Sequence, residues 1–220
     1  MKAIPLETLE LLPATTPRQL FVLLHDAGGS ALDMLELANL LGDSFAEAAV
    51  VMPEGIESIH LGKTERQWFP TFELTDANRP ERVAKAVAPL ADFIRQQQER
   101  FGILQSDTAL AGFSQGATMA LALSDRHDGL VGRVLAFSGC YAAWPDKAPG
   151  LTTIHLLHGQ LDTVVPARLA QQAYAELTAL GADATCDIAS TIGHELHPVL
   201  MEQAIHRLQT CVPLRFWRSA

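Results

Sequence analysis

The chain has 220 residues, of which 48% are hydrophobic, and its formal net charge is −9. This length suits one well-buried core, so we expect a single domain over residues 1–220. Because phosphate binding requires clustered Lys and Arg, the acidic balance and the lack of a basic run argue against a nucleic-acid partner.

The N-terminal residues lack the uninterrupted apolar core of a signal peptide, and no later segment has the length of a membrane span. We therefore expect a cytoplasmic protein with no membrane span. Cys140, Cys186 and Cys211 are scattered and odd in number, which is typical of reduced thiols rather than of a disulfide framework or metal cluster.

Short apolar runs alternate with helical patterns along the chain. This alternation predicts an α/β fold, with a mostly parallel central sheet and helices on both faces. Residues 5–15 are expected to add an antiparallel edge strand. The other expected strands are residues 19–25, 48–53, 107–112, 131–138, 152–158 and 184–190. The expected helices are residues 31–41, 79–101, 115–126, 166–180 and 195–209.

The first strong strand, residues 19–25, leads into a loop that contains Gly28 and Gly29. Glycines allow the backbone to turn there and to present an N–H group to a site at the carboxyl end of the sheet. A plain Gly-Gly connection to the next helix is the alternative interpretation.

The connection between residues 53 and 80 is long and contains Trp68, Phe69 and Phe72. These rings could form the wall of an acyl pocket, and on this hypothesis Trp68 and Phe69 bind substrate. Alternatively, they cover the edge of the sheet. The sequence does not decide between the two.

Residues 112–116, Gly-Phe-Ser-Gln-Gly, place Ser114 between a strand-like run and a helix-like one. A sharp turn from strand to helix exposes the serine hydroxyl and requires very small residues two positions to either side. Gly112 and Gly116 meet this requirement. The motif predicts that Ser114 is a nucleophile and that the N–H of Gln115 is one oxyanion donor.

A serine nucleophile needs a general base and an acid that orients the base. Asp162 follows the expected strand at 152–158, and His194 follows the one at 184–190, so both lie after Ser114 in the order typical of a strand-to-helix elbow. His197 is the reserve candidate for the base. His155 and His158 are three residues apart on a strand and point to opposite faces, so we expect no metal site there.

These segments together resemble the α/β-hydrolase serine esterases of the carboxylesterase, acyl-protein thioesterase and lysophospholipase family. The likeness is to a small bacterial esterase subgroup with Arg-Gln-Trp-Phe at residues 66–69. It implies Ser114, Asp162 and His194 as the catalytic triad, and the N–H groups of Ala27 and Gln115 as the oxyanion donors.

One residue departs from the family pattern, because Asp26 stands where the family has glycine. A carboxylate beside a developing oxyanion would oppose catalysis. We therefore expect Asp26 to point away from the site or to cap the following helix.

The resemblance implies hydrolysis of carboxylic esters with short to medium acyl chains through an acyl-serine intermediate. Only residues 138–150 leave room for a lid, so we expect no large lid, and we expect no cofactor or metal. The alternatives are an acyl-protein thioesterase or lysophospholipase, and, of a different class, a non-catalytic binding protein of the same fold. The sequence leaves open the physiological ester or thioester, and it is compatible with a homodimer.

Overall fold

The computed structural model describes residues 6–59 and 65–212. Its strands are β1 (Thr8–Leu11), β2 (Gln19–Leu24), β3 (Ala48–Pro53), β4 (Glu57–Ser58), β5 (Arg66–Gln67), β6 (Thr108–Phe113), β7 (Arg133–Phe137), β8 (Thr153–Gly159) and β9 (Ala184–Ala189). Its helices are α1 (Leu35–Ser44), α2 (Arg79–Phe101), α3 (Gln115–Arg126), α4 (Arg168–Ala179) and α5 (Pro198–Thr210), with 3-10 turns at Ala31–Met34 and Gln105–Asp107.

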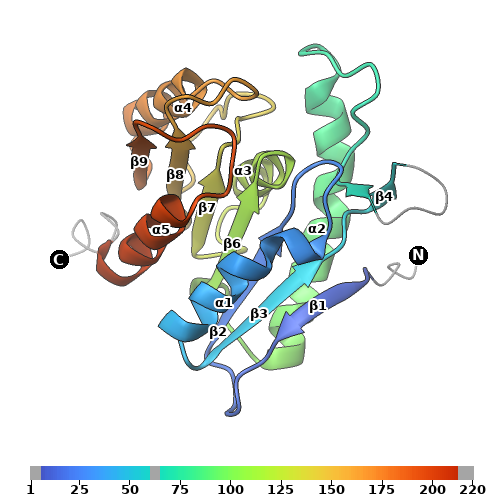
Figure 1. Cartoon of the computed structure of the whole chain (residues 1–220), viewed down its shortest axis with the longest axis vertical. Coiled ribbons are helices and arrows are strands. Elements are labelled where there is room, and N and C mark those ends of the chain that lie inside the picture. Colours follow the sequence, from blue (N-terminus) through green and yellow to red (C-terminus); the bar gives the residue numbers. More distant parts are fainter. Residues whose placement is uncertain (1–5, 60–64, 213–220) are drawn as a thin grey trace.

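Within the described residues, seven strands form one twisted sheet in the order β1-β3-β2-β6-β7-β8-β9 (Figure 1). All neighbouring strands are parallel except β1, which pairs antiparallel with β3 at the edge. The expected mostly parallel sheet and its antiparallel edge strand are therefore confirmed. A further small pair, β4 with β5, was not expected from the sequence.

The strands are apolar on both faces because helices cover both faces of the sheet. In β2, Leu20, Val22 and Leu24 belong to the core shared with α2, α3 and α4. Phe21 and Leu23 belong to the opposite core, shared with α1 and α5. Alternation along the strand therefore divides its side chains between the two layers.

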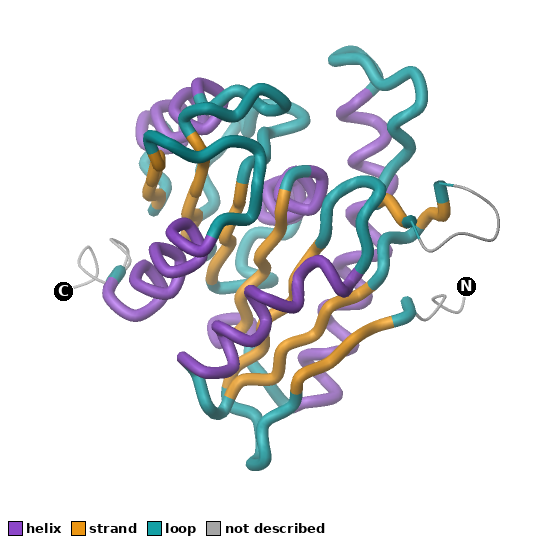
Figure 2. Tube along the Cα trace, in the orientation of Figure 1, coloured by secondary structure: helices purple, strands orange, loops and turns teal. Residues whose placement is uncertain are grey.

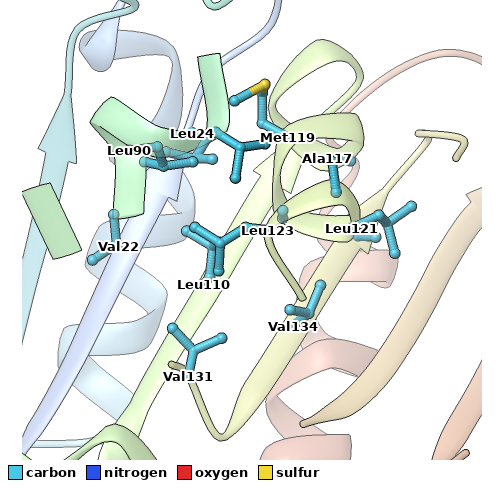
Figure 3. Packing of buried hydrophobic residues seen from close by; sticks show 14 of the residues in the cluster. Val22, Leu24, Leu90, Leu110, Ala117, Met119, Leu121, Leu123, Val131 and Val134 are labelled. Carbon is cyan, nitrogen blue, oxygen red and sulfur yellow. The ribbon is translucent and has the colours of Figure 1, made fainter. Parts of the chain in front are cut away.

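Figure 3 shows the core on the α2 and α3 side of the sheet. Val22, Leu110 and Val134 come from neighbouring strands, and Leu121 of α3 and Leu90 of α2 pack over them. All five side chains are buried. This packing fixes α3, and with it the turn that precedes α3, against the middle of the sheet.

The parallel strands all end at one edge of the sheet, where their loops come together (Figure 2). In such sheets, ligand sites lie outside the carboxyl ends of the strands. The loops after β2, β6, β8 and β9 carry the candidate residues. Residues 138–152, between β7 and β8, contain no helix or strand, as expected for a chain without a large lid.

No helix in the described ranges is long and apolar enough to cross a membrane. The three cysteines, all within the described part of the chain, are free thiols.

Candidate active site

Ser114 occupies a strained turn between β6 and α3. Its φ is 54° and its ψ is −109°, which is a backbone conformation that residues with side chains rarely adopt. The Ser114 N–H donates to the Phe137 carbonyl of the neighbouring strand at 2.8 Å, which holds the turn against the sheet. The sequence-predicted elbow is thus present in the structure.

The two glycines of the elbow are required by close backbone contacts. A Cβ at Gly112 would lie 2.3 Å from the backbone of Gly116, and a Cβ at Gly116 would lie 2.2 Å from the carbonyl oxygen of Leu24. No side chain could be accommodated at either position without moving the backbone. Their spacing in the sequence therefore reflects the tight contact between β6, α3 and β2.

The structure brings together three side chains that are widely separated in the sequence. His194 Nε2 lies 3.1 Å from Ser114 Oγ, and His194 Nδ1 lies 2.7 Å from Asp162 Oδ2. Ser114 and Asp162 are buried, whereas His194 is partly exposed. A hydroxyl, an imidazole and a carboxylate in this series have the geometry for nucleophilic catalysis.

The carboxylate of Asp162 is fixed by the turn that follows β8. Its Oδ1 accepts hydrogen bonds from the N–H groups of Val164 and Val165, at 2.9 and 2.8 Å. Burial would raise the pKa of Asp162, but the hydrogen bonds from His194, Val165 and Val164 outweigh burial and lower it. The ionised form is therefore favoured, as a partner of the His194 ring requires.

His158 is a further contact of Asp162 that was not predicted from the sequence. Its Nε2 lies 2.7 Å from the Val165 carbonyl oxygen and 3.1 Å from Asp162 Oδ2. An N–H at Nε2 would donate to these oxygens. Burial lowers the pKa of His158, mainly by desolvation, and favours the neutral ring. The sequence signal for this contact was that His158 stands at the end of β8 and Asp162 follows four residues later, in the turn after the strand.

His197, the reserve candidate for the base, has a structural role. Helix α5 begins at Pro198 rather than at 195, and the Nδ1 of His197 accepts a hydrogen bond from Val199 N–H at 3.2 Å. This bond caps the helix. The structure brings His194, and not His197, to Ser114.

The two expected oxyanion donors differ in whether their N–H groups already have a hydrogen-bond partner. Gln115 is the first residue of α3, and N–H groups in a first helical turn have no partner within the helix. The Ala27 N–H, by contrast, donates to Asp26 Oδ1 at 2.5 Å. One expected donor thus already binds a carboxylate.

The expectation for Asp26 is therefore wrong. The following turn is capped by Asp33, whose Oδ2 accepts from the Ser30 N–H at 2.7 Å, and not by Asp26. The reason lies in a tight turn closed by a hydrogen bond from Gly29 N–H to the Asp26 carbonyl at 3.2 Å. This turn keeps the Ala27 amide within reach of the Asp26 side chain.

Trp68 and Phe69 are buried in the core on the α2 side of the sheet. Their exposed fractions are 1% and 3%, and both belong to the core under α2. They reach a cavity of about 410 Å³ beside α2, which none of the three residues Ser114, Asp162 and His194 lines. Phe72 is 79% exposed and lies at the same cavity.

The segment around Trp68 instead connects the two loops of the site. Trp68 Nε1–H donates to the His25 carbonyl at 2.9 Å, and the side chain of Gln115 accepts from Trp68 N–H at 2.6 Å and donates to the Phe69 carbonyl at 2.8 Å. Arg66 pairs with the backbone of Gly28 and Gly29 at 2.8 and 2.9 Å. We call residues 66–69 the brace, because they hold the elbow and the Ala27 loop together.

The phospholipase/carboxylesterase family model matches residues 11–212. This chain belongs to that family. It is 35% identical over 208 residues to the esterase YpfH of Escherichia coli K12, covering 94% of this chain and 89% of that protein. It is 26% identical over 162 residues to acyl-protein thioesterase 1 of Candida albicans, covering 66% of this chain and 70% of that protein.

Among solved structures, the crystal structure of esterase PE8 superposes with a TM-score of 0.85 and 29% identity, covering 95% of this chain and 100% of that one. Zea mays acyl-protein thioesterase 2 has the same fold, with a TM-score of 0.74 and 20% identity over 92% of this chain and 97% of that one. The expected α/β-hydrolase fold is confirmed. The chain is a hydrolase that acts on esters.

Proposed function

We propose that this protein hydrolyses carboxylic esters of short to medium acyl chains through an acyl-Ser114 intermediate. The observation that supports it most is the hydrogen-bonded series from Ser114 Oγ through His194 to Asp162. The strained Ser114 turn and the lowered pKa of Asp162 fit the same roles.

In this mechanism, His194 Nε2 accepts the Ser114 proton while Oγ attacks the ester carbonyl carbon. The carbonyl oxygen becomes an oxyanion that binds the N–H of Gln115 and, once Asp26 moves aside, the N–H of Ala27. His194 then donates its proton to the departing alcohol, which leaves an acyl-Ser114 ester. A water molecule, deprotonated by His194, releases the acid and regenerates the hydroxyl.

The absence of a helix or strand in residues 138–152 supports an accessible site for esters in solution. The likeness to proteins named acyl-protein thioesterases keeps a thioester substrate as the second candidate. The same residues would serve both chemistries, because attack at the carbonyl carbon is common to the two.

A fluorophosphonate probe tests the nucleophile. We expect covalent labelling that is lost in Ser114→Ala and retained in Ser124→Ala, a buried serine of the same helix whose hydroxyl bonds to the Leu121 carbonyl. Nitrophenyl esters and acyl thioesters of increasing chain length then distinguish the substrate classes. A folded protein that is not labelled would favour a binding role, and activity that survives Ser114→Ala or His194→Ala would refute the mechanism.

A further inference from the structure

A groove of about 500 Å³ lies beside the proposed catalytic residues at the carboxyl edge of the sheet. It is bounded by the start of α2, the loop after β7 and the start of α4, which lie at the same end of the molecule (Figure 1). Arg79 and Arg168 stand at its border, so we call it the Arg79–Arg168 groove.

Two sets of contacts join this groove to the triad. Val164 and Val165 line it, and their N–H groups are those that hold Asp162. On the other side, Cys140 lines it and follows directly on Gly139 in the loop after β7. The preceding Gly139 packs so closely that a Cβ there would lie 3.1 Å from the Ser114 carbonyl oxygen. None of Ser114, Asp162 and His194 lines the groove itself, so a group bound there would belong to a part of the substrate beyond the scissile carbonyl.

The walls of the groove combine apolar surface with positive charge. Trp144 is 44% exposed and Val164 is 66% exposed, and Trp144 packs against the buried Tyr141 with the ring centroids 6.1 Å apart. Apolar side chains left exposed beside a site are available to contact a ligand.

The charged residues that line this groove are mainly basic, whereas the molecule as a whole has a net charge of −9. Arg79 Nη2 lies 3.4 Å from Asp76 Oδ1, and that carboxylate is almost fully exposed to solvent. The guanidinium of Arg168 forms no ion pair with another residue of the described ranges. Two guanidinium groups and one carboxylate leave the groove with excess positive charge.

We propose that the Arg79–Arg168 groove binds an anionic group of the substrate, so that the enzyme prefers esters that carry a carboxylate or phosphate besides the bond it cleaves. A guanidinium recognises such planar or tetrahedral oxyanions through paired hydrogen bonds. The apolar wall would contact the carbon chain between this anion and the scissile carbonyl. The proposal rests on the proposed esterase function and names the class of substrate.

The test compares kcat/KM for three esters: nitrophenyl butyrate, the nitrophenyl monoester of succinic acid, and the butyrate ester of 4-hydroxybenzoate. The second has its anion on the acyl side and the third on the alcohol side. In Arg168→Glu, we expect the kcat/KM of one anionic ester relative to nitrophenyl butyrate to fall by about fivefold or more, as loss of an ion pair and gain of repulsion require. The ester whose ratio falls identifies the side of the substrate that carries the anion.

Arg18→Glu is the matched control, since Arg18 is an exposed arginine at a different groove, lined by Gln19, Glu47 and Asp107. It removes the same charge and should leave both ratios unchanged. If both ratios stay unchanged in Arg168→Glu, or fall equally in Arg18→Glu, the anionic subsite is refuted. If the wild type cleaves none of the three esters, or cleaves them without Ser114, the proposed function itself fails.

Discussion

The Asp26 carboxylate binds the Ala27 amide, one of the two N–H groups proposed to bind an oxyanion at Ser114. Charged hydrogen bonds contribute about 1.5–3 kcal/mol, so freeing this N–H before catalysis has an energetic cost. We predict that Asp26→Ala raises kcat on nitrophenyl butyrate by about tenfold, because the donor becomes free and the repulsion of the oxyanion disappears.

Glu36→Ala is the control for Asp26→Ala, because it removes an exposed carboxylate from the nearby helix α1 without touching the Ala27 loop. It should leave kcat within about twofold of the wild-type value. An unchanged or reduced kcat in Asp26→Ala would mean that the carboxylate does not compete with the oxyanion.

Asp162 offers the second prediction at the scale of single residues. Asp162→Asn keeps the shape of the side chain but removes the charge that orients His194 Nδ1–H, and we expect kcat to fall by about 10³- to 10⁴-fold. Steady-state kinetics measure this loss, and circular dichroism checks the fold. The matched control is Asp187→Asn, a carboxylate that pairs with Arg207 away from Ser114. A kcat within tenfold of wild type in Asp162→Asn would exclude the proposed role.

The meeting of Ser114, His194 and Asp162 at one place could be predicted from the sequence, because each follows its own strand and parallel strands end at a common edge. The sequence was not sufficient for Asp26 and His158. Both depend on where a side chain turns within a loop, and this is set by hydrogen bonds to backbone atoms that sequence patterns do not specify.

Among the elements, the brace connects the Ser114 elbow to the Ala27 loop, which are the two segments proposed to supply the oxyanion donors. Trp68→Phe keeps a buried aromatic ring but removes the N–H that donates to the His25 carbonyl. We predict a tenfold or larger fall in kcat with little change in KM, because a displaced oxyanion donor weakens the transition state more than the bound substrate. A loss of about 1 kcal/mol in the free energy of unfolding should accompany it.

Phe72→Ala is the control for the brace, since this exposed ring belongs to the same connection but not to the core. It should change neither kcat nor the free energy of unfolding appreciably. A rise in KM with unchanged kcat in Trp68→Phe would instead favour the substrate-binding role first considered for Trp68.

The long elements were predictable because their apolar periodicity extends over many residues; the expected helices at 79–101 and 115–126 coincide with α2 and α3. The β4–β5 pair was not, because each strand has two residues and is largely polar. Helix α5 starts later than expected because Pro198 suits the first helical position, and the preceding His197 provides the cap.

At the scale of the whole molecule, the buried histidines link stability to pH. Burial lowers the pKa of His155 to about 3, chiefly by desolvation, and lowers the pKa of His25 and His158 for the same main reason. Unfolding returns these rings to water, where they bind protons near pH 6.5. The unfolded chain therefore binds more protons than the folded one between about pH 6.5 and 3, so stability falls as the pH falls through this range.

His155 is a buried residue of β8, with Nδ1 at 2.9 Å from Thr185 Oγ1 of the neighbouring strand β9, and its replacement isolates one part of this effect. For each pH unit below 6.5, protonation of His155 in the unfolded chain should lower the free energy of unfolding by about 1.4 kcal/mol. The wild type should therefore lose about 2 kcal/mol through this residue between pH 6.5 and 5. His155→Gln, which cannot titrate, should lose that much less than the wild type. Urea unfolding at pH 7.5 and 5.0 measures the difference.

His206→Gln provides the comparison, because it makes the same exchange at an exposed position of α5. The same experiment tests our proposal that residues 1–220 form a single domain, since fluorescence and circular dichroism should then report one coincident transition.

Equal pH dependence in His155→Gln and the wild type would show that His155 is protonated to the same extent in the folded and unfolded chains. In that case the sheet would have to admit water, or a counter-charge, to the ring that it buries.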